Sequence, residues 1–141
     1  MRIGIVGSEA ANFTPKTVAE ERKLIRTILQ PGDVVVSGKC HLGGIDIWAV
    51  EEAVKLGLSY KEWPPKHRAW EGGYKQRNLE IAKDSDKVVC ITVRSLPITY
   101  TGMRFSHCYH CGTYDHVKSG GCWTVKQAKR MGKEGLVLIV E

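Results

Sequence analysis

Apolar residues recur along this chain in short runs that alternate with longer segments of helical spacing. The runs begin near residues 2, 34, 58, 87 and 136, and each has the length of a strand. The run at 34–36 is all valine, which is typical of a parallel strand buried on both faces. The run at 58–63 is mixed and could form an edge strand. The pattern predicts a three-layer, Rossmann-like α/β domain with a mainly parallel sheet of about five strands.

Helical spacing of apolar residues fills the intervals between these runs. Three helices are expected before residue 94, over residues 14–30, 45–56 and 71–83. Thr14 has the character of an N-cap, with Pro15 at the first helical position. Gly57 ends the second helix, and the third helix would place Arg77 and Asn78 near its middle. A last helix is expected after residue 120.

The segment 94–119 is long for a connection between elements of a compact domain. Such a segment usually carries function or a staple of its own. A chain of 141 residues fits one domain and can bury about two thirds of its unfolded surface. We therefore expect a single domain over 1–141, with 94–119 as an insertion within it.

Cysteine and histidine gather in and just after this insertion. Cys108, Cys111, His116 and Cys122 have the spacing C-x2-C-x4-H-x5-C, one residue longer in the last gap than a compact zinc knuckle. A tight C-x2-C turn points two thiolates at one centre, so the spacing predicts a structural zinc ion. The alternative is four unrelated small residues in a loop. Competing ligands are His107, His110, Cys40 and His41. Cys90, in contrast, is expected to be a small core residue.

Charge and composition narrow the class of protein. The 21 Lys and Arg residues exceed the 15 Asp and Glu residues, but they form no basic block, so a dedicated nucleic-acid surface is not favoured. The five cysteines are odd in number, and the N-terminal segment lacks the order of a secretory signal. We expect a cytoplasmic protein with reduced thiols. No apolar run approaches the roughly 20 residues that a membrane span needs.

Two glycine-rich turns, over 37–46 and 119–124, each lie between a predicted strand or loop and a helix. Glycine allows a ligand to approach backbone N–H groups, and a helix N-terminus favours an anion. The turns therefore predict a phosphate or carboxylate site at the carboxyl ends of the strands. The alternative for each is an ordinary tight turn.

Four segments occur together in a characteristic order. They are GIVGS at 4–8, SGKCHLGGID at 37–46, RNLEIA at 77–82 and SGGCWTVKQAKRMGK at 119–133. In this order they resemble the SLOG superfamily of Rossmann-like proteins, and most closely its small YpsA-like branch. The larger group includes the LOG phosphoribohydrolases and the DNA-processing DprA proteins. The resemblance covers most of the chain and implies a nucleotide-like or phosphoribosyl ligand over the strand ends.

The resemblance also implies which residues hold the ligand. They are Gly7, Ser8, Ser37, Gly38, Lys39, Gly43, Gly44, Asp46, Arg77, Asn78, Gly120, Gly121, Trp123 and Thr124. Arg77 and Asn78 match the family's RN pair, and arginine suits bidentate contact with phosphate. Trp123, Trp63 and Trp70 could stack on a base, with Trp123 the best placed, although each is more often a packing residue.

The sequence departs from the LOG enzymes at their PGGxGTxxE element. Lys126 and Gln127 stand where the catalytic glutamate would be expected, so catalysis stays open. The leading hypothesis is a SLOG-type module that binds a phosphorylated nucleotide-derived ligand. One alternative is a nucleotide-metabolism enzyme, either a phosphoribohydrolase or a nucleoside-cleaving transferase, that uses Glu9 or Asp46. A nucleic-acid-binding protein is a third hypothesis. The sequence leaves open whether the chain forms a homo-oligomer.

Overall fold

The five predicted strands form a single parallel sheet in the computed structural model, which describes residues 1–141. The strands are β1 (Arg2–Gly7), β2 (Val34–Ser37), β3 (Ser59–Glu62), β4 (Lys87–Val93) and β5 (Glu134–Val140). Their order is β3-β2-β1-β4-β5, and every neighbouring pair is parallel. The α/β fold with a five-stranded parallel sheet is therefore confirmed.

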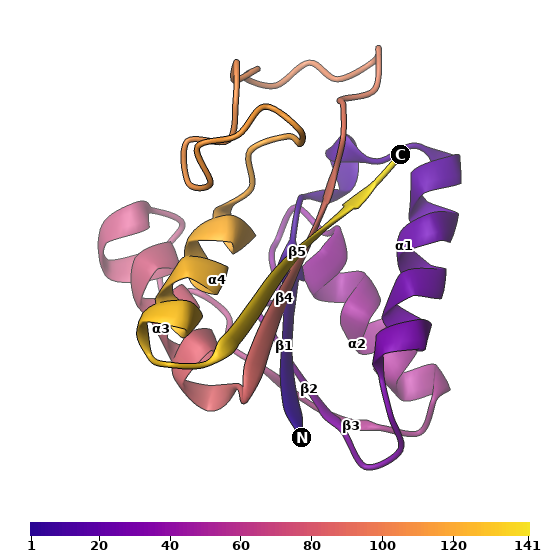
Figure 1. The fold of residues 1–141 in the computed structure, drawn as a ribbon, viewed down its shortest axis with the longest axis vertical. Helices are drawn as coiled ribbons and strands as arrows, with labels where there is room; N and C mark the ends of the chain where they lie inside the picture. Colours follow the sequence, from indigo (N-terminus) through magenta and orange to yellow (C-terminus); the bar gives the residue numbers. More distant parts are fainter.

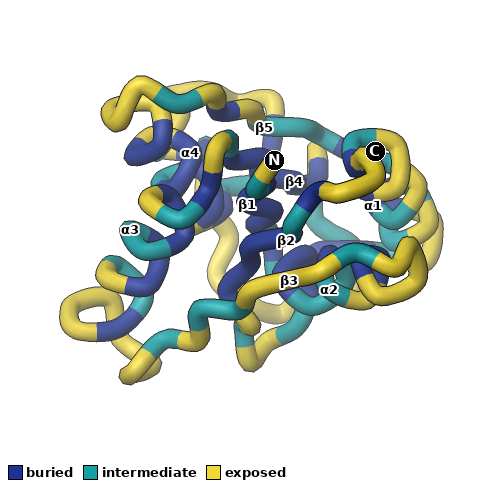
Figure 2. The backbone as a smooth tube through the Cα atoms, turned by 90° about the horizontal axis from the view of Figure 1, so that it is seen from below, coloured by how far each residue is buried: buried dark blue, intermediate teal, exposed yellow.

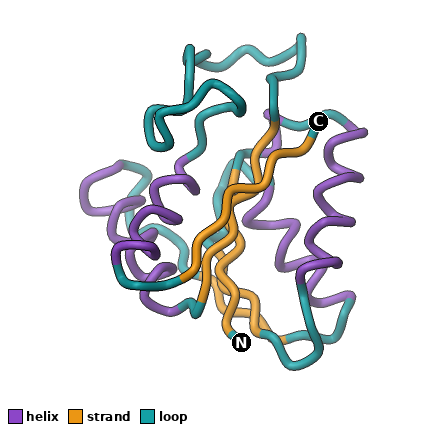
Figure 3. Tube along the Cα trace, viewed as in Figure 1, coloured by secondary structure: helices purple, strands orange, loops and turns teal.

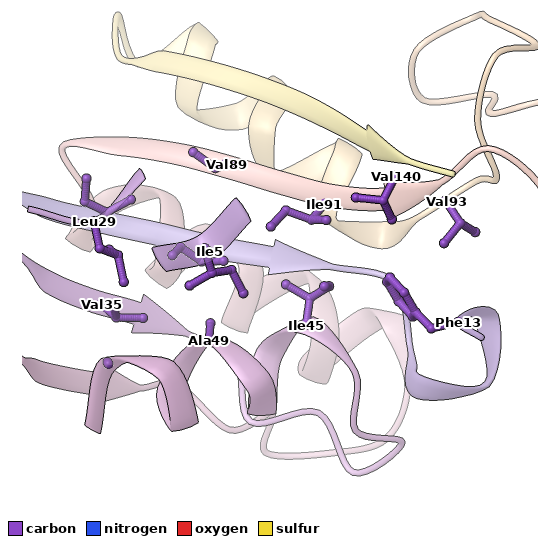
Figure 4. Close-up of a cluster of buried hydrophobic side chains, with 13 residues drawn as sticks. Ile5, Phe13, Leu29, Val35, Ile45, Ala49, Val89, Ile91, Val93 and Val140 are labelled. Carbon is purple, nitrogen blue, oxygen red and sulfur yellow. The ribbon is translucent and has the colours of Figure 1, made fainter. Parts of the chain in front are cut away.

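Helices cover both faces of the sheet, which gives three layers (Figure 1). The helices are α1 (Pro15–Ile28), α2 (Ile45–Lys55), α3 (Lys75–Asp84) and α4 (Gly120–Arg130), with short turns η1 (Ala10–Asn12) and η2 (Trp70–Tyr74). Helices α1 and α2 pack on one face, and α3 and α4 pack on the other. The core under α1 and α2 contains Ile5, Ile45 and Ile91 (Figure 4). A second core, which includes Val36, Ile81 and Val125, lies under α3 and α4. None of the helices combines the length and the apolar character that crossing a membrane requires.

Strand β3 lies at one edge of the sheet and has only four residues, none of them buried. Figure 2 shows this strand largely in the colour of exposed residues, whereas β1 and β4 run through the buried interior. The mixed composition of residues 58–63 reflects this position, because an edge strand has no continuous apolar layer on both sides.

The start of α1 is fixed by the residues that predicted it. The Thr17 amide donates to Thr14 Oγ1 at 3.2 Å, and the Thr14 amide donates to Thr17 Oγ1 at 2.8 Å. Pro15 occupies the first helical position, where no amide donor is needed. Reciprocal capping of this kind confirms the predicted helix start.

The prediction of a helix over 71–83 is wrong at its beginning. Glu71 and Gly72 have non-helical backbone angles, with Gly72 at a φ of +77°. Gly73 packs so closely on the backbone of His67 that a Cβ would overlap the His67 carbonyl oxygen. Two adjacent glycines also disfavour a helix. Helix α3 therefore begins at Lys75, so Arg77 lies in its first turn rather than in its middle.

The strand order contains one switch point. From β1 the chain adds β2 and β3 on one side, and it then returns to add β4 and β5 on the other side. In open parallel sheets, ligands bind beyond the carboxyl ends of the two strands where the order reverses. The long connection between β4 and α4 leaves the sheet at this same end, as the loop segments of Figure 3 show. The fold therefore predicts a ligand site at the carboxyl ends of β1 and β4.

The opposite end of the sheet is held by the carboxylate of Asp84. It accepts hydrogen bonds from Arg2 Nε and Nη2, both at 2.9 Å, and from the Trp63 indole at 2.9 Å. The Arg2 hydrogen bonds, together with the Trp63 hydrogen bond, hold the pKa of Asp84 below its usual range. This one carboxylate joins the start of β1, the end of α3 and the segment after β3.

We predict that Asp84→Asn lowers the free energy of unfolding by about 1 kcal/mol at pH 7. Because the folded-state pKa is lowered, the stabilisation is present above the unfolded pKa of about 3.9 and is lost as the pH falls through the folded value. Urea denaturation should therefore show a smaller difference in the free energy of unfolding between the wild type and Asp84→Asn at pH 3 than at pH 7. Glu80→Gln, a change of a half-exposed carboxylate on the same helix, is the control. An equal difference at both pH values contradicts the assignment.

Candidate functional site

A cavity of about 350 Å³ lies at the switch point. Its walls come from the end of β1, from η1 and the turn before α2, from the start of α3, from the first turns of α4 and from the long connection. Among the residues predicted to bind the ligand, those that line it are Gly7, Ser8, Asp46, Arg77, Asn78, Gly120, Gly121 and Thr124. We call it the switch-point cavity.

Other predicted residues lie behind the cavity wall and shape it from there. The buried Ser37 hydroxyl donates to the carbonyls of Ile5 and Asp46, both at 3.0 Å. A Cβ at Gly38 would overlap the guanidinium of Arg77 and lie 2.6 Å from Asp46 Oδ2. The end of β2 therefore makes room for Arg77 rather than contacting a ligand.

The two glycine turns differ in what their helix N-termini face. At α2, the Ile45 amide donates to the Ser8 carbonyl at 3.2 Å, and the backbone of residues 8–10 packs on Gly44. Gly43 and Gly44, both with positive φ, shape this turn but do not line the cavity. The N-terminus of α2 is covered by the chain after β1.

The N-terminus of α4, in contrast, faces the cavity. Ser119 caps the helix by accepting the Gly121 amide at 3.1 Å, and Gly120 has no neighbouring atom where a side chain would be. The Thr124 hydroxyl, one turn further on, is fully buried and has no hydrogen-bond partner. Asn12 Oδ1, on the η1 wall, is also buried and unpaired. Unpaired buried polar groups are rare; of the three residues that carry them, Thr124 and Asn12 line this cavity, and the third is Glu21 in α1.

Arg77 is the buried cation of the cavity, with 9% of its surface exposed. Its Nε donates to Asn78 Oδ1 at 2.7 Å, and its Nη1 donates to the Gly38 carbonyl. Nη1 also lies 3.6 Å from Asp46 Oδ2, and the guanidinium carbon lies 5.4 Å from the centre of the Tyr74 ring. These contacts fix the guanidinium while Nη2 makes no hydrogen bond to the protein.

Two carboxylates share the cavity with Arg77. Burial raises the pKa of Asp46 to about 6, although the charge of Arg77 opposes the shift. Glu9 Oε1 accepts a hydrogen bond from the Tyr100 hydroxyl at 3.3 Å. The cavity therefore offers a cation and hydrogen-bond acceptors together, and Asp46 changes its protonation near neutral pH.

Sequence reasoning missed several residues that line the cavity. They are Val6, Asn12, Cys40, Leu42, Tyr74, Tyr100 and Lys118, whereas Trp70, which was named as a possible stacking residue, does line the cavity. Lys118 directly precedes the second glycine turn, so its place in the sequence could have predicted that it lies near the ligand site. Trp123 does not line the cavity; its ring packs edge-on against Trp70, with centroids 4.8 Å apart. Trp63 lies elsewhere, on Asp84.

The second site is the Cys/His cluster formed by Cys108, Cys111, His116 and Cys122. The four possible ligand atoms all lie within 4.8 Å of one another. Cys108 begins a tight turn, because its amide donates to the Thr113 carbonyl at 3.0 Å and its carbonyl accepts the Gly112 amide at 2.8 Å. Cys122 comes from the first turn of α4. The predicted spacing thus brings all four residues to one centre.

The donor set of the cluster fits a metal ion. His116 Nε2 lies 3.7 Å from Cys122 Sγ, while Nδ1 lies 2.8 Å from Asp115 Oδ1, a carboxylate–histidine arrangement common at metal sites. Burial, together with the charge of neighbouring Cys122, raises the pKa of the Cys111 thiol to about 12. The neighbouring Cys90 thiol and burial likewise raise the pKa of Cys122. A bound cation would reverse these shifts and allow all three thiols to ionise.

The competing ligands lie outside the cluster. The ring of His107 lies 5.2 Å from that of Tyr114, and the ring of His110 lies 4.4 Å from that of Tyr109. Cys40 and His41 line a second cavity, and Cys40 also lines the switch-point cavity. Cys90 is fully buried in the core, as predicted, with its sulfur 3.9 Å from Cys122 Sγ.

No protein-family model matches this chain, and a search of curated proteins found no match either. The class of protein is therefore defined by its fold and sites. It is a Rossmann-like α/β domain with a polar switch-point cavity and a cluster of three cysteines and one histidine beside it.

We predict that the purified protein carries about one metal ion per chain, and that Cys111→Ser, at the exposed position of the cluster, removes most of it. Asp115→Asn should weaken metal binding about tenfold, because it loosens the orientation of His116. Elemental analysis and chelator competition measure both effects. The double variant His107→Ala/His110→Ala is the control and should keep its metal. Unchanged metal content in Cys111→Ser contradicts the assignment.

Proposed function

We propose that this protein is a SLOG-type module that binds a phosphorylated nucleotide-derived ligand in the switch-point cavity, with zinc as the structural metal of the Cys/His cluster. The observation that carries the proposal is the buried, fixed guanidinium of Arg77. It lines the same cavity as the N-terminus of α4 and two unpaired buried polar atoms.

The cationic part of the cavity supports a phosphate. Arg77 Nη2 is free to donate, and a guanidinium binds phosphate oxygens with good geometry. The open turn at Gly120 adds the Gly120 amide, which makes no hydrogen bond within the protein, and the positive end of the α4 dipole. A contact of this kind contributes about 0.3 to 1 kcal/mol when exposed. Lys118 lies in the same wall. Together these groups favour an anion of phosphate size.

The remaining polar groups support a sugar or a base next to that phosphate. Glu9 and Asp46 can accept hydrogen bonds from hydroxyl groups, and Asn12 Oδ1 and Thr124 Oγ1 lack partners within the protein. A volume of about 350 Å³ is within the range of small-molecule sites. A phosphoribosyl group combines the anion and the hydroxyls that these residues would recognise.

The insertion supports zinc as a structural metal. Three thiolates and one imidazole form a closed tetrahedral set with no open position for substrate. The insertion exposes several large apolar residues, among them Ile98 and Met103, so it has little core of its own. A metal would supply the stabilisation that this segment cannot obtain from burial.

We predict that Thr124→Val lowers the affinity for a nucleoside 5′-monophosphate about five- to tenfold, which corresponds to about 1 kcal/mol for one lost hydrogen bond. The stability of the free protein should not fall, because the hydroxyl has no partner within it. Calorimetric titration with the common nucleoside 5′-monophosphates measures the affinity. Thr124→Ser keeps the hydroxyl and is the control. Equal affinities of the Val and Ser variants contradict the proposed contact.

The phosphate contact is tested separately with Arg77→Lys. Lysine keeps a positive charge near Asp46 but cannot reproduce the fork of arginine. The affinity for monophosphates should fall about tenfold, whereas the affinity for the corresponding nucleosides should change little. Equal losses for both ligands would remove Arg77 from the phosphate site.

One observation favours an enzyme as the second candidate function. Asp46 lines the cavity with a pKa of about 6, which suits proton transfer near neutral pH. A phosphoribohydrolase or a nucleoside-cleaving transferase would use it as a base, with a rate that rises as the pH increases through about 6. Chromatography would then detect free base released from nucleoside monophosphates, and Asp46→Asn would abolish the release. Binding without any release assigns the site to a binding module.

A further inference from the structure

A second cavity, of about 430 Å³, lies between the turn after β2 and the segment that follows β3. Its basic lining residues are Lys39, His41, Lys66, His67 and Arg68, and no Asp or Glu lines it. Every cation in the switch-point cavity shares that space with carboxylates, whereas here there are none. We call this space the basic cavity.

The cations of the basic cavity are not neutralised by the protein. Lys39, Lys66 and Arg68 form no ion pair, although ion pairs engage basic side chains on α1, α2 and α3. Cations gathered on one concave surface create a positive potential that concentrates anions. The protein thus leaves three positive charges directed to a solvent-filled space without a counter-charge of its own.

Backbone strain marks the same place. Lys39 has a φ of +51°, and it is the one residue other than glycine with a positive φ. That conformation is unfavourable for a side chain with a Cβ, and strained residues of this kind concentrate at binding sites. The carbonyl of the preceding Gly38 is held by Arg77, so the cation of the switch-point cavity fixes the backbone that presents Lys39.

The basic cavity and the switch-point cavity share part of one wall. Cys40 lines both of them. The Tyr74 hydroxyl, from the switch-point cavity, lies 3.3 Å from Nδ1 of His41 in the basic cavity. The two cavities are therefore neighbours at the turn of residues 38–41, and a ligand that contacts both would cross this turn.

We infer that the basic cavity binds the further phosphate groups of the same ligand, and that this ligand is a nucleoside polyphosphate rather than a monophosphate. The inference rests on the proposed function for the nucleotide part and adds the second anion. A nucleic-acid backbone is less favoured, because its phosphates require a basic track, and here the unpaired cations gather around one cavity.

The experiment compares inorganic orthophosphate with inorganic tripolyphosphate on the metal-loaded protein, by calorimetry at about 0.15 M ionic strength. These probes need no knowledge of the base. The test variant is Lys66→Gln/Arg68→Gln. The control is Lys23→Gln/Arg130→Gln, which removes one lysine and one arginine that are also exposed but line neither cavity. Both variants carry the same net charge, so a general charge effect cancels.

We expect the wild type and the control to bind tripolyphosphate at least about tenfold more tightly than orthophosphate, and the test variant to lose most of that preference. In one outcome, tripolyphosphate binding depends on Lys66 and Arg68, but orthophosphate binding does not depend on Arg77. That outcome supports the basic cavity and contradicts the proposed function. Orthophosphate binding that depends on Arg77, with no gain for tripolyphosphate, overturns the inference alone.

Two further outcomes overturn the inference. Equal losses in the test and control variants would show that tripolyphosphate responds only to net charge. A dependence on Lys66 and Arg68 that appears with a single-stranded oligonucleotide of about ten nucleotides, but not with tripolyphosphate, would assign the basic cavity to a nucleic-acid backbone.

Discussion

The close contact between Gly7 and Gly121 is the constraint on which both sites depend. A Cβ at Gly121 would lie 2.8 Å from Cys90 Sγ and 3.0 Å from the Gly7 nitrogen, and a Cβ at Gly7 would overlap the Ile91 carbonyl oxygen. Because Gly121 has no side chain, the first turn of α4 can rest on the ends of β1 and β4, and the absence of a side chain at Gly7 lets β1 lie close to Ile91 of β4. That position opens the α4 N-terminus to the switch-point cavity and brings Cys122 to the Cys/His cluster.

Much of the architecture could be predicted because it is determined by local pattern. The valine run of β2, the Thr14–Pro15 start of α1 and the mixed edge strand β3 each follow from the spacing and type of neighbouring residues. The geometry of the C-x2-C turn is also local, and the four residues predicted from this spacing do lie together. The fourth residue of the cluster, Cys122, belongs to α4. This helix lies beside the C-x2-C turn because of its packing on the sheet, which local spacing does not predict.

The remaining site residues could not be predicted, because tertiary contacts alone bring them together. Asn12 ends the short turn η1, and Tyr100 lies in the long connection; neither segment has an apolar periodicity, yet both residues reach the switch-point cavity. The coverage of the α2 N-terminus by residues 8–10 cannot be inferred from a glycine turn. The late start of α3 had a readable signal in its two adjacent glycines, but the contact of Gly73 with His67 is what excludes the longer helix.

The position of the cluster has a consequence for chemical sensitivity. Cys108, His116 and Cys122 are buried, whereas Cys111 is exposed, so an oxidant or a chelator reaches the cluster at Cys111 first. The insertion that the cluster holds also carries Tyr100 and Lys118 to the cavity, and Cys122 lies two residues before Thr124. Metal and ligand would therefore stabilise the same turn of α4, and by thermodynamic reciprocity each would strengthen the binding of the other. Oxidation of the Cys111 thiol would then lower the affinity of the switch-point cavity for its ligand.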